Sequence, residues 1–261
     1  MKILLNGALG FMGREVAALC EAGYRAAVLA AGVDPAAQNT NGVPVYRNLD
    51  DVPENLDVDC IVDFSHHTST PALLEFAARR GIPTVVATTG HTEEELCAIK
   101  EASFRIPVFF SANMSLGIAL LVELAKKAAE AMPDAEIEII EKHHDRKLDA
   151  PSGTALMLAD AIREVRPSSY ANCGRSGHGK RTADEIGIHA IRMGNIVGEH
   201  EVIVGTANQT VTLKHEAHSR ALFAEGALAA AAYLVGKGEG LYDMKSLVSS
   251  SDEKAENTIG I

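Results

Sequence analysis

The chain has 261 residues, with 24 lysines and arginines against 35 aspartates and glutamates, so its formal net charge is −11. This acidic balance disfavours nonspecific nucleic-acid binding and leaves no polybasic patch for a membrane surface. The hydrophobic content of 47% is ordinary for a globular protein, and the length suits one large domain or two small ones.

Cysteine spacing and apolar run length indicate the compartment. The four cysteines, Cys20, Cys60, Cys97 and Cys173, form no Cys-x-x-Cys pair, which disfavours a zinc site built on thiolates. The apolar run at residues 1–7 is too short for a signal peptide, and no stretch reaches the roughly 18 apolar residues of a membrane helix. We therefore expect a cytoplasmic protein with no membrane partner and no nucleic-acid partner.

The N-terminal residues predict a strand, a glycine turn, a helix and a second strand. An apolar run at 2–6 breaks into Gly7-Ala8-Leu9-Gly10-Phe11-Met12-Gly13, and a helical pattern and an apolar strand at 26–33 follow. This is the opening unit of a doubly wound parallel sheet. Its glycines let the backbone approach a pyrophosphate, whose charge the N–H groups at the helix start bind. The spacing is a Gly-x-x-Gly-x-x-Gly variant of the usual dinucleotide motif.

Asp34 follows the second strand, 21 residues after Gly13. A carboxylate there accepts hydrogen bonds from the ribose hydroxyls of NAD. Together the glycine turn and Asp34 predict a dinucleotide site. The alternative is a tight corner that binds no ligand, because glycines are common between strands and helices.

Three further strands continue the alternating pattern. They are expected at 58–64, 83–87 and 106–110, with helices at 71–80 and 92–102. Ligands of open parallel sheets bind beyond the carboxyl ends of the strands. The corners Ala87-Thr88-Thr89 and Ser111-Ala112-Asn113-Met114 are therefore expected to contact the cofactor, unless they serve only as helix caps. His66 and His67 are expected at the rim.

The composition changes near residue 114, where we place a domain boundary. A long helix at 115–132, a strand at 135–140 and a helix at 154–165 precede three strands at 187–193, 196–205 and 210–215. Gly194-Asn195 predicts a hairpin turn between the first two of those strands. We expect a dinucleotide-binding domain over 1–114, completed by 218–261, and a substrate domain over 115–217. The role of the 167–185 loop stays open.

The stretch from Glu141 to Thr154 is too rich in titratable groups for a packed core. His143, His144 and Lys147 lie within five residues, and Ser152-Gly153-Thr154 opens the next helix. A hydride acceptor must also gain a proton, which a histidine or lysine supplies. N–H groups at the helix start suit a substrate carboxylate. The pattern predicts a nicotinamide-dependent reductase of a small carboxylate.

Two other interpretations of this stretch are open. The histidines could be structural, although Lys147 and the Ser-Gly-Thr helix start argue against that. A metal could also bind His143, His144, Asp145 and Asp149. Adjacent histidines on an extended segment point to opposite faces, so they rarely share one ion, and no metal is expected.

The residues Glu141-Lys142-His143-His144 and Lys147-Leu148-Asp149-Ala150-Pro151-Ser152-Gly153-Thr154-Ala155 closely resemble the signature of the 4-hydroxy-tetrahydrodipicolinate reductase (dihydrodipicolinate reductase) family. The likeness runs nearly end to end. It includes Gly7 to Gly13, Val62-Asp63-Phe64-Ser65, Thr88-Thr89-Gly90, Ala112-Asn113, Gly198-Glu199-His200 and Gly240-Leu241-Tyr242.

The resemblance implies NAD(P)H-dependent reduction of 4-hydroxy-tetrahydrodipicolinate, a small dicarboxylate, to tetrahydrodipicolinate in lysine and diaminopimelate biosynthesis. It also implies a Rossmann-type α/β domain, and a second α+β domain whose open mixed sheet builds a homotetramer. His143 resembles the family's proton donor, Lys147 its second donor, and His144, Gly153 and Thr154 its substrate contacts. The cofactor contacts implied are Gly7, Ala8, Leu9, Gly10, Phe11, Met12, Asp34, Ala87, Thr88, Thr89, Ser111, Ala112, Asn113 and Met114. Which of His143 and Lys147 delivers the proton stays open.

Departures from the family pattern affect the choice of cofactor. Phe11 stands where the family often has arginine or lysine, and Pro35 follows Asp34 where enzymes that favour NADPH carry a nearby arginine. An acidic residue with no cation beside it repels a 2′-phosphate, so we expect NADH to be preferred over NADPH. Ala87 replaces a usual glycine, which should be tolerated. The alternatives are another two-domain NAD(P)-dependent dehydrogenase and a non-catalytic NAD-binding sensor.

Overall fold

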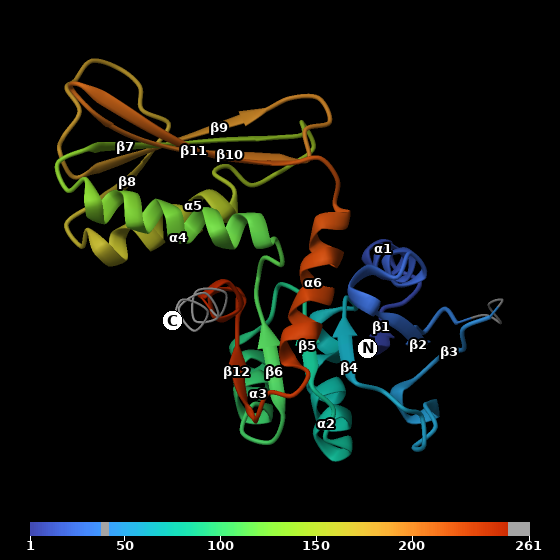
Figure 1. Cartoon of the computed structure of the whole chain (residues 1–261). Helices are drawn as coiled ribbons and strands as arrows, with labels where there is room; N and C mark the ends of the chain where they lie inside the picture. Colours follow the sequence, from blue (N-terminus) through green and yellow to red (C-terminus); the bar gives the residue numbers. More distant parts are fainter. Residues whose placement is uncertain (38–41, 250–261) are drawn as a thin grey trace, which may run out of the picture. The chain divides into compact units, whose positions relative to one another are not determined.

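The computed structural model describes residues 1–37 and 42–249, and it divides into two compact units (Figure 1). The first unit comprises Met1–Leu116 and the segment that begins at Ala221. The second unit comprises Gly117–Arg220. The assignment of a cofactor to the first unit and a substrate to the second stays a prediction.

A seven-stranded parallel sheet forms the first unit, which confirms the predicted doubly wound α/β fold. In spatial order the strands are β12 (Gly240–Tyr242), β6 (Pro107–Phe110), β5 (Thr84–Val86), β4 (Cys60–Asp63), β1 (Lys2–Asn6), β2 (Val28–Val33) and β3 (Val45–Tyr46). The two edge strands, β12 and β3, were not foreseen. They are too short to produce a readable alternation of apolar residues.

Helices cover both faces of this sheet. The elements are α1 (Phe11–Glu21), α2 (Thr70–Arg80), α3 (Glu93–Ala102) and α6 (Ala221–Leu234), with short 3₁₀ turns η1 (Tyr24–Ala26), η2 (Leu49–Asp51) and η3 (His67–Ser69). Helices α2 and α3 pack together over a core that includes Leu4 and Ile61, while α1 packs against α6. Thr92 and Glu95 form the capping box that starts α3.

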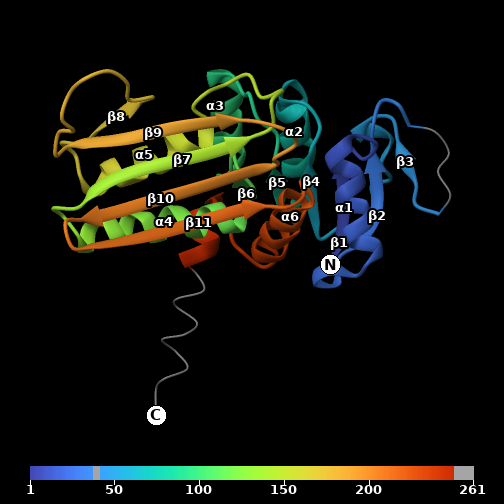
Figure 2. The ribbon, with the colours of Figure 1, turned by 90° about the horizontal axis from the view of Figure 1, so that it is seen from above.

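A five-stranded mixed sheet forms the second unit, also as predicted, and Figure 2 shows its strands side by side. Their order is β11 (Gln209–Ala217), β10 (Gly198–Thr206), β7 (Glu136–His143), β9 (Glu185–Arg192) and β8 (Tyr170–Cys173). Helices α4 (Leu116–Ala131) and α5 (Gly153–Val165) bury one face of the sheet. That core includes Ile139, Ile188 and Val202, one from each central strand.

The hairpin predicted at Gly194-Asn195 is wrong. Strand β7 lies between β9 and β10, pairing parallel with β9 and antiparallel with β10. The hairpin is instead formed by β10 and β11, with Thr206 paired to Gln209. Alternation of apolar residues shows which face of a strand is buried, but it does not show which strands pair with it. The sequence could therefore not place β7 in the centre of the sheet.

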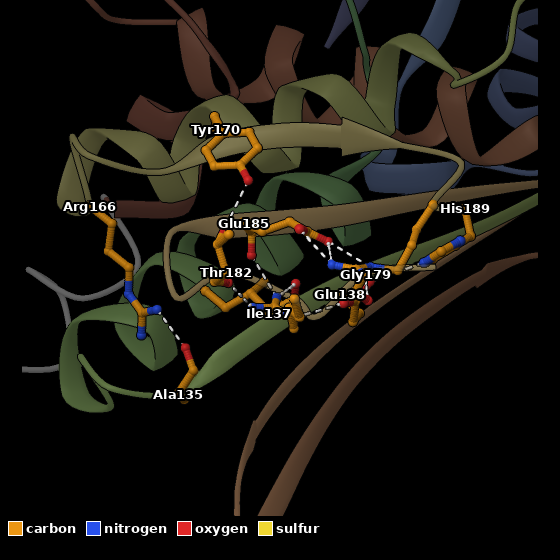
Figure 3. A network of polar contacts seen from close by, with 11 residues as sticks. Ala135, Ile137, Glu138, Arg166, Tyr170, Gly179, Thr182, Glu185 and His189 are labelled. Carbon is orange, nitrogen blue, oxygen red and sulfur yellow. Dashed lines mark hydrogen bonds and ion pairs between the residues drawn. The ribbon is translucent and has the colours of Figure 1, made fainter. Parts of the chain in front are cut away.

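Strand β7 also runs further than expected, so His143 lies on a strand and not in a loop. The 167–185 segment contains β8. Ion pairs from two of its arginines go to Glu138 and Glu185, which Figure 3 labels within a network of polar contacts. Arg175 forms an ion pair with the buried Glu185 at 2.7 Å, and Arg181 pairs with Glu138 at 3.1 Å. This segment is therefore tied to the sheet.

Gly226 in α6 provides a test of the packing in the first unit. A Cβ at this position would lie 1.7 Å from the carbonyl oxygen of Met114. Alanine favours a helix by about 1 kcal/mol over glycine, but overpacking costs about 1–3 kcal/mol, and a contact this close lies at the upper end. We predict that Gly226→Ala lowers the free energy of unfolding, measured by urea denaturation. Gly238→Ala is the control, because a Cβ there has no neighbour within 4 Å; equal stability of the two variants would contradict the packing.

Candidate functional site

The glycine turn after β1 is built by close backbone contacts. The N–H groups of Gly7 and Ala8 both donate to the Val33 carbonyl, at 2.8 and 3.2 Å. Gly7 has a φ of +79°, and a Cβ there would lie 2.7 Å from the backbone of Phe64. Helix α1 then begins with no side-chain cap and no acidic residue in its first turn. The positive end of this helix therefore suits a pyrophosphate.

Asp34 lies beside this turn. Its carboxylate accepts hydrogen bonds from the Leu9 N–H and the Ala36 N–H, both at 3.0 Å. The half-buried side chain thus links the glycine turn to the end of β2. Phe11, the first residue of α1, is 61% exposed, and Leu9 and Met12 are half-buried.

The other predicted cofactor corners lie at the same edge of the sheet, because its strands are parallel. Ala87-Thr88-Thr89 follows β5, and Thr88 Oγ1 lies 3.1 Å from His91 Nε2. In the corner after β6, Ser111 Oγ donates to the Asn113 carbonyl at 2.8 Å. Ala112 and Thr89 are exposed, whereas Ala87, Thr88 and Met114 are buried. The structure therefore brings all the predicted cofactor residues of the first unit to one edge.

Beneath this edge lies a buried polar pair that the sequence interpretation missed. Asp63, at the end of β4, accepts hydrogen bonds from Asn6 Nδ2 at 2.9 Å and from the Ser65 N–H at 3.1 Å. Burial raises the pKa of the Asp63 carboxyl. The pair joins the ends of β1 and β4 under the glycine turn. The sequence did carry a signal for this pair, because Asn6 and Asp63 are each the polar residue that ends an apolar strand.

His143 lies at the end of β7 in the second unit, on the helix-covered face. Its Nδ1 is 2.6 Å from Oε2 of Glu141, two residues earlier on the same face. Glu141 is fully buried, and Arg192 at the end of β9 holds both of its oxygens, at 2.6 and 2.7 Å. Burial alone would raise the pKa of Glu141, but hydrogen bonds from Arg192, His143 and Ser152 outweigh it and lower that pKa.

His200 on β10 completes this buried group. Its ring packs edge-on against that of His143, with centroids 5.1 Å apart, and its Nε2 lies 3.2 Å from Ser152 Oγ. Burial, and then the nearby His143, lower the pKa of His200 to about 4. The ring is therefore neutral at pH 7, and its Nε2 can accept a hydrogen bond from the Ser152 hydroxyl.

The remaining predicted residues surround the start of α5. Ser152 caps this helix by accepting a hydrogen bond from the Ala155 N–H at 3.3 Å, and its first two residues are Gly153 and Thr154. Lys147 Nζ pairs with Asp149 at 2.8 Å. Half-buried His144 has its pKa lowered by desolvation and then by Arg146 and Arg220. No group of three possible metal ligands occurs among residues 1–37 and 42–249.

Glu141, Arg192 and His200 were not singled out from the sequence. Glu141 had a detectable signal, since residues two apart on a strand share a face and Glu141 precedes His143 by two. Arg192 had none, because its position depends on β9 pairing with β7. Similarly, His200 lies opposite Glu141 only through the β10 pairing.

A parallel sheet with this glycine turn, joined to a second unit with a mixed sheet and a buried imidazole–carboxylate group, is the build of a nicotinamide-dependent oxidoreductase. Family models agree. The dihydrodipicolinate reductase N-terminus model matches residues 1–114, and the C-terminus model matches 117–248. The chain belongs to the dihydrodipicolinate reductase family.

Individual relatives support this membership over the whole length. The chain is 48% identical to a 4-hydroxy-tetrahydrodipicolinate reductase of Caldanaerobacter subterraneus, over 95% of this chain and 98% of the relative. It is 42% identical to the one of Clostridium tetani, over 96% and 98%. A dipicolinate-bound dihydrodipicolinate reductase structure from Paenisporosarcina has a TM-score of 0.78 at 26% identity, covering 93% of this chain and 97% of that one. In the described part of the chain, every helix is too short or too polar to cross a membrane.

The neutral His200 predicts a pH dependence of stability. Its pKa is about 4 in the folded protein against an ordinary 6.5, so the unfolded chain binds more protons between these values. Stability should therefore fall as the pH drops from about 6.5 to about 4, by about 3 kcal/mol from this group. His200→Gln should flatten that slope in urea denaturation, whereas His178→Gln, in an exposed loop, should keep it. An unchanged slope in His200→Gln would contradict a buried neutral His200.

Proposed function

We propose that this protein catalyses the NAD(P)H-dependent reduction of 4-hydroxy-tetrahydrodipicolinate, with loss of water, to tetrahydrodipicolinate in lysine and diaminopimelate biosynthesis. One observation carries the proposal: His143 is held by a buried carboxylate at 2.6 Å, next to a helix start suited to a carboxylate ligand. The names of the full-length relatives and the dipicolinate bound to the related structure support the same substrate class.

The bound nicotinamide supplies the hydride. We propose that Gly7, Ala8, Leu9, Gly10, Phe11 and Met12 hold its pyrophosphate at the start of α1, and that Asp34 binds the adenosine ribose. The corners Ala87-Thr88-Thr89 and Ser111-Ala112-Asn113-Met114 would complete the site at the same sheet edge. Asp34 is followed by Pro35, so no cation from that position offsets the carboxylate, and NADH is proposed as the preferred cofactor.

The proton is proposed to come from His143 or Lys147. Per turnover the substrate gains one hydride and one proton and loses one water. His143 is largely buried and fixed by its Nδ1 contact, whereas Lys147 pairs with Asp149 nearer the surface. The substrate's carboxylates are proposed to bind His144 and the N–H groups of Gly153 and Thr154. We further propose a homotetramer built through the mixed sheet, and a cytoplasmic location.

The direct assay is oxidation of NADH in the presence of the freshly made product of dihydrodipicolinate synthase. Turnover is expected with this substrate. Intact NADH binding without turnover would instead favour another substrate or a non-catalytic sensor.

Replacing the proposed proton donors should reduce the rate and leave the cofactor bound. General acid catalysis contributes about 10² to 10⁴ in rate, so His143→Gln should lower kcat by at least about a hundredfold, and Lys147→Ala should lower it similarly. The Kd for NADH, measured by fluorescence titration, should stay within twofold. An unchanged kcat for either variant would remove that residue from proton delivery.

Removing the carboxylate of Asp34 tests the proposed cofactor preference. Asp34→Ala should raise the KM for NADH by about tenfold, since it loses a charged hydrogen bond to the ribose worth about 1.5 kcal/mol. The KM for NADPH should fall or stay unchanged, because the repulsion of the 2′-phosphate is removed. A wild-type kcat/KM for NADPH equal to or above that for NADH would contradict the proposed preference.

A further inference from the structure

Glu141 has every oxygen engaged, and its partners come from three elements. Oε2 contacts His143 Nδ1 at 2.6 Å and Arg192 Nη1 at 2.7 Å. Oε1 accepts from the Ser152 N–H at 2.9 Å and from Arg192 Nη2 at 2.6 Å. One buried carboxylate therefore joins the imidazole on β7 to the residue that caps α5.

Arg192 fastens the same segment at a second point. Its Nη2 also donates to the Asp149 carbonyl at 2.6 Å. The chain from Asp149 to Ser152 is thus held at both ends, by Arg192 at one and by Glu141 at the other. Gly153 and Thr154 follow directly, so the position of their N–H groups depends on this double attachment.

The donor and acceptor roles follow from the chemistry of the groups. A guanidinium has only donors, and its two bonds to Glu141 help to lower the pKa of that carboxyl despite its burial. Glu141 is therefore ionised and only accepts. His143 Nδ1 must then carry a hydrogen and donate a hydrogen bond to Oε2 of Glu141. Nε2 is left as the atom that exchanges a proton. A Cβ on Gly198 would lie 3.1 Å from this Nε2, so the glycine leaves space beside it.

We propose that Glu141, held by Arg192, is a positioning residue that sets the tautomer of His143 and fixes the helix start at Gly153 and Thr154 relative to it. This inference rests on the proposed function of His143 and of that helix start. Glu141 does not touch the reacting atoms and does not relay the proton, because two bonds from Arg192 keep it ionised. It couples the proton donor to the carboxylate-binding site through a single side chain.

The variant Glu141→Gln separates these roles. An amide has one accepting and one donating side, whereas the site demands acceptance on both. If the amide nitrogen faces His143, Nδ1 must accept and the proton moves to Nε2. If it faces Ser152, the amide NH2 points at the Ser152 N–H, two donors oppose each other, and the start of α5 loosens. The matched control is Glu185→Gln, which removes another buried carboxylate paired with an arginine on the same sheet.

Three measurements decide the outcome. Long-range ¹H–¹⁵N spectra, with the His143 signal identified by its loss in His143→Gln, report which ring nitrogen carries the proton without any turnover. Titration with dipicolinate reports the carboxylate site, and kcat reports the reaction. In Glu141→Gln we expect kcat to fall at least a hundredfold, with either the proton on Nε2 or the Kd for dipicolinate raised at least tenfold. Glu185→Gln should stay within threefold of wild type in kcat and Kd and keep the proton on Nδ1.

The inference is overturned if Glu141→Gln keeps both the Nδ1 proton and the dipicolinate Kd of the wild type, whatever its kcat. Should Glu141→Gln fail to fold, Glu141→Asp decides, because its shorter carboxylate cannot reach all its partners. A folded Glu141→Asp that loses the Nδ1 proton or raises the dipicolinate Kd more than threefold, with unchanged NADH binding, supports the inference. One that keeps the Nδ1 proton and a Kd within threefold of wild type overturns it. If the wild type does not turn over the substrate but carries the His143 proton on Nδ1 as described, the proposed function is wrong and the positioning role of Glu141 still holds.

Discussion

The buried ion pair between Glu141 and Arg192 is the interaction on which the second unit's proposed site depends. Removing a carboxylate from water is costly unless its hydrogen bonds are replaced, and four donated bonds from Arg192, His143 and Ser152 replace them here. The same bonds place an imidazole and a helix start beside each other. The same hydrogen bonds therefore offset the cost of burying the charge and fix the geometry of the site.

In the first unit the corresponding constraint is the parallel direction of the strands. Because all seven strands end at the same edge, turns separated by up to about a hundred residues of chain lie along one line. Gly7 can take its tight turn against Phe64 only without a side chain. Asp34 then links that turn to β2 by accepting from Leu9. The proposed cofactor contacts follow from this topology and from hydrogen bonds local to each corner.

The local pattern of apolar and polar residues predicted much of this fold. Most of what that pattern missed depends on pairing between strands that are distant in the sequence. Apolar alternation located β7, and the Ser-Gly-Thr sequence located the start of α5. Alternation could not show that β7 lies between β9 and β10, so the hairpin at Gly194-Asn195 was wrong. For the same reason Arg192 and His200 were missed. Arg192 reaches Glu141 from β9, and His200 reaches His143 and Ser152 from β10. Glu141 itself could have been inferred from its position two residues before His143.

We propose above all that this chain transfers a hydride from the nicotinamide to a cyclic dicarboxylate. The most direct test uses NADH deuterated at nicotinamide C4, on the face that this enzyme uses, with the freshly made product of dihydrodipicolinate synthase, and mass spectrometry of the product. Wild type is predicted to give tetrahydrodipicolinate that carries one deuterium. NADH binding with no deuterium in any product of that substrate would contradict this hydride transfer.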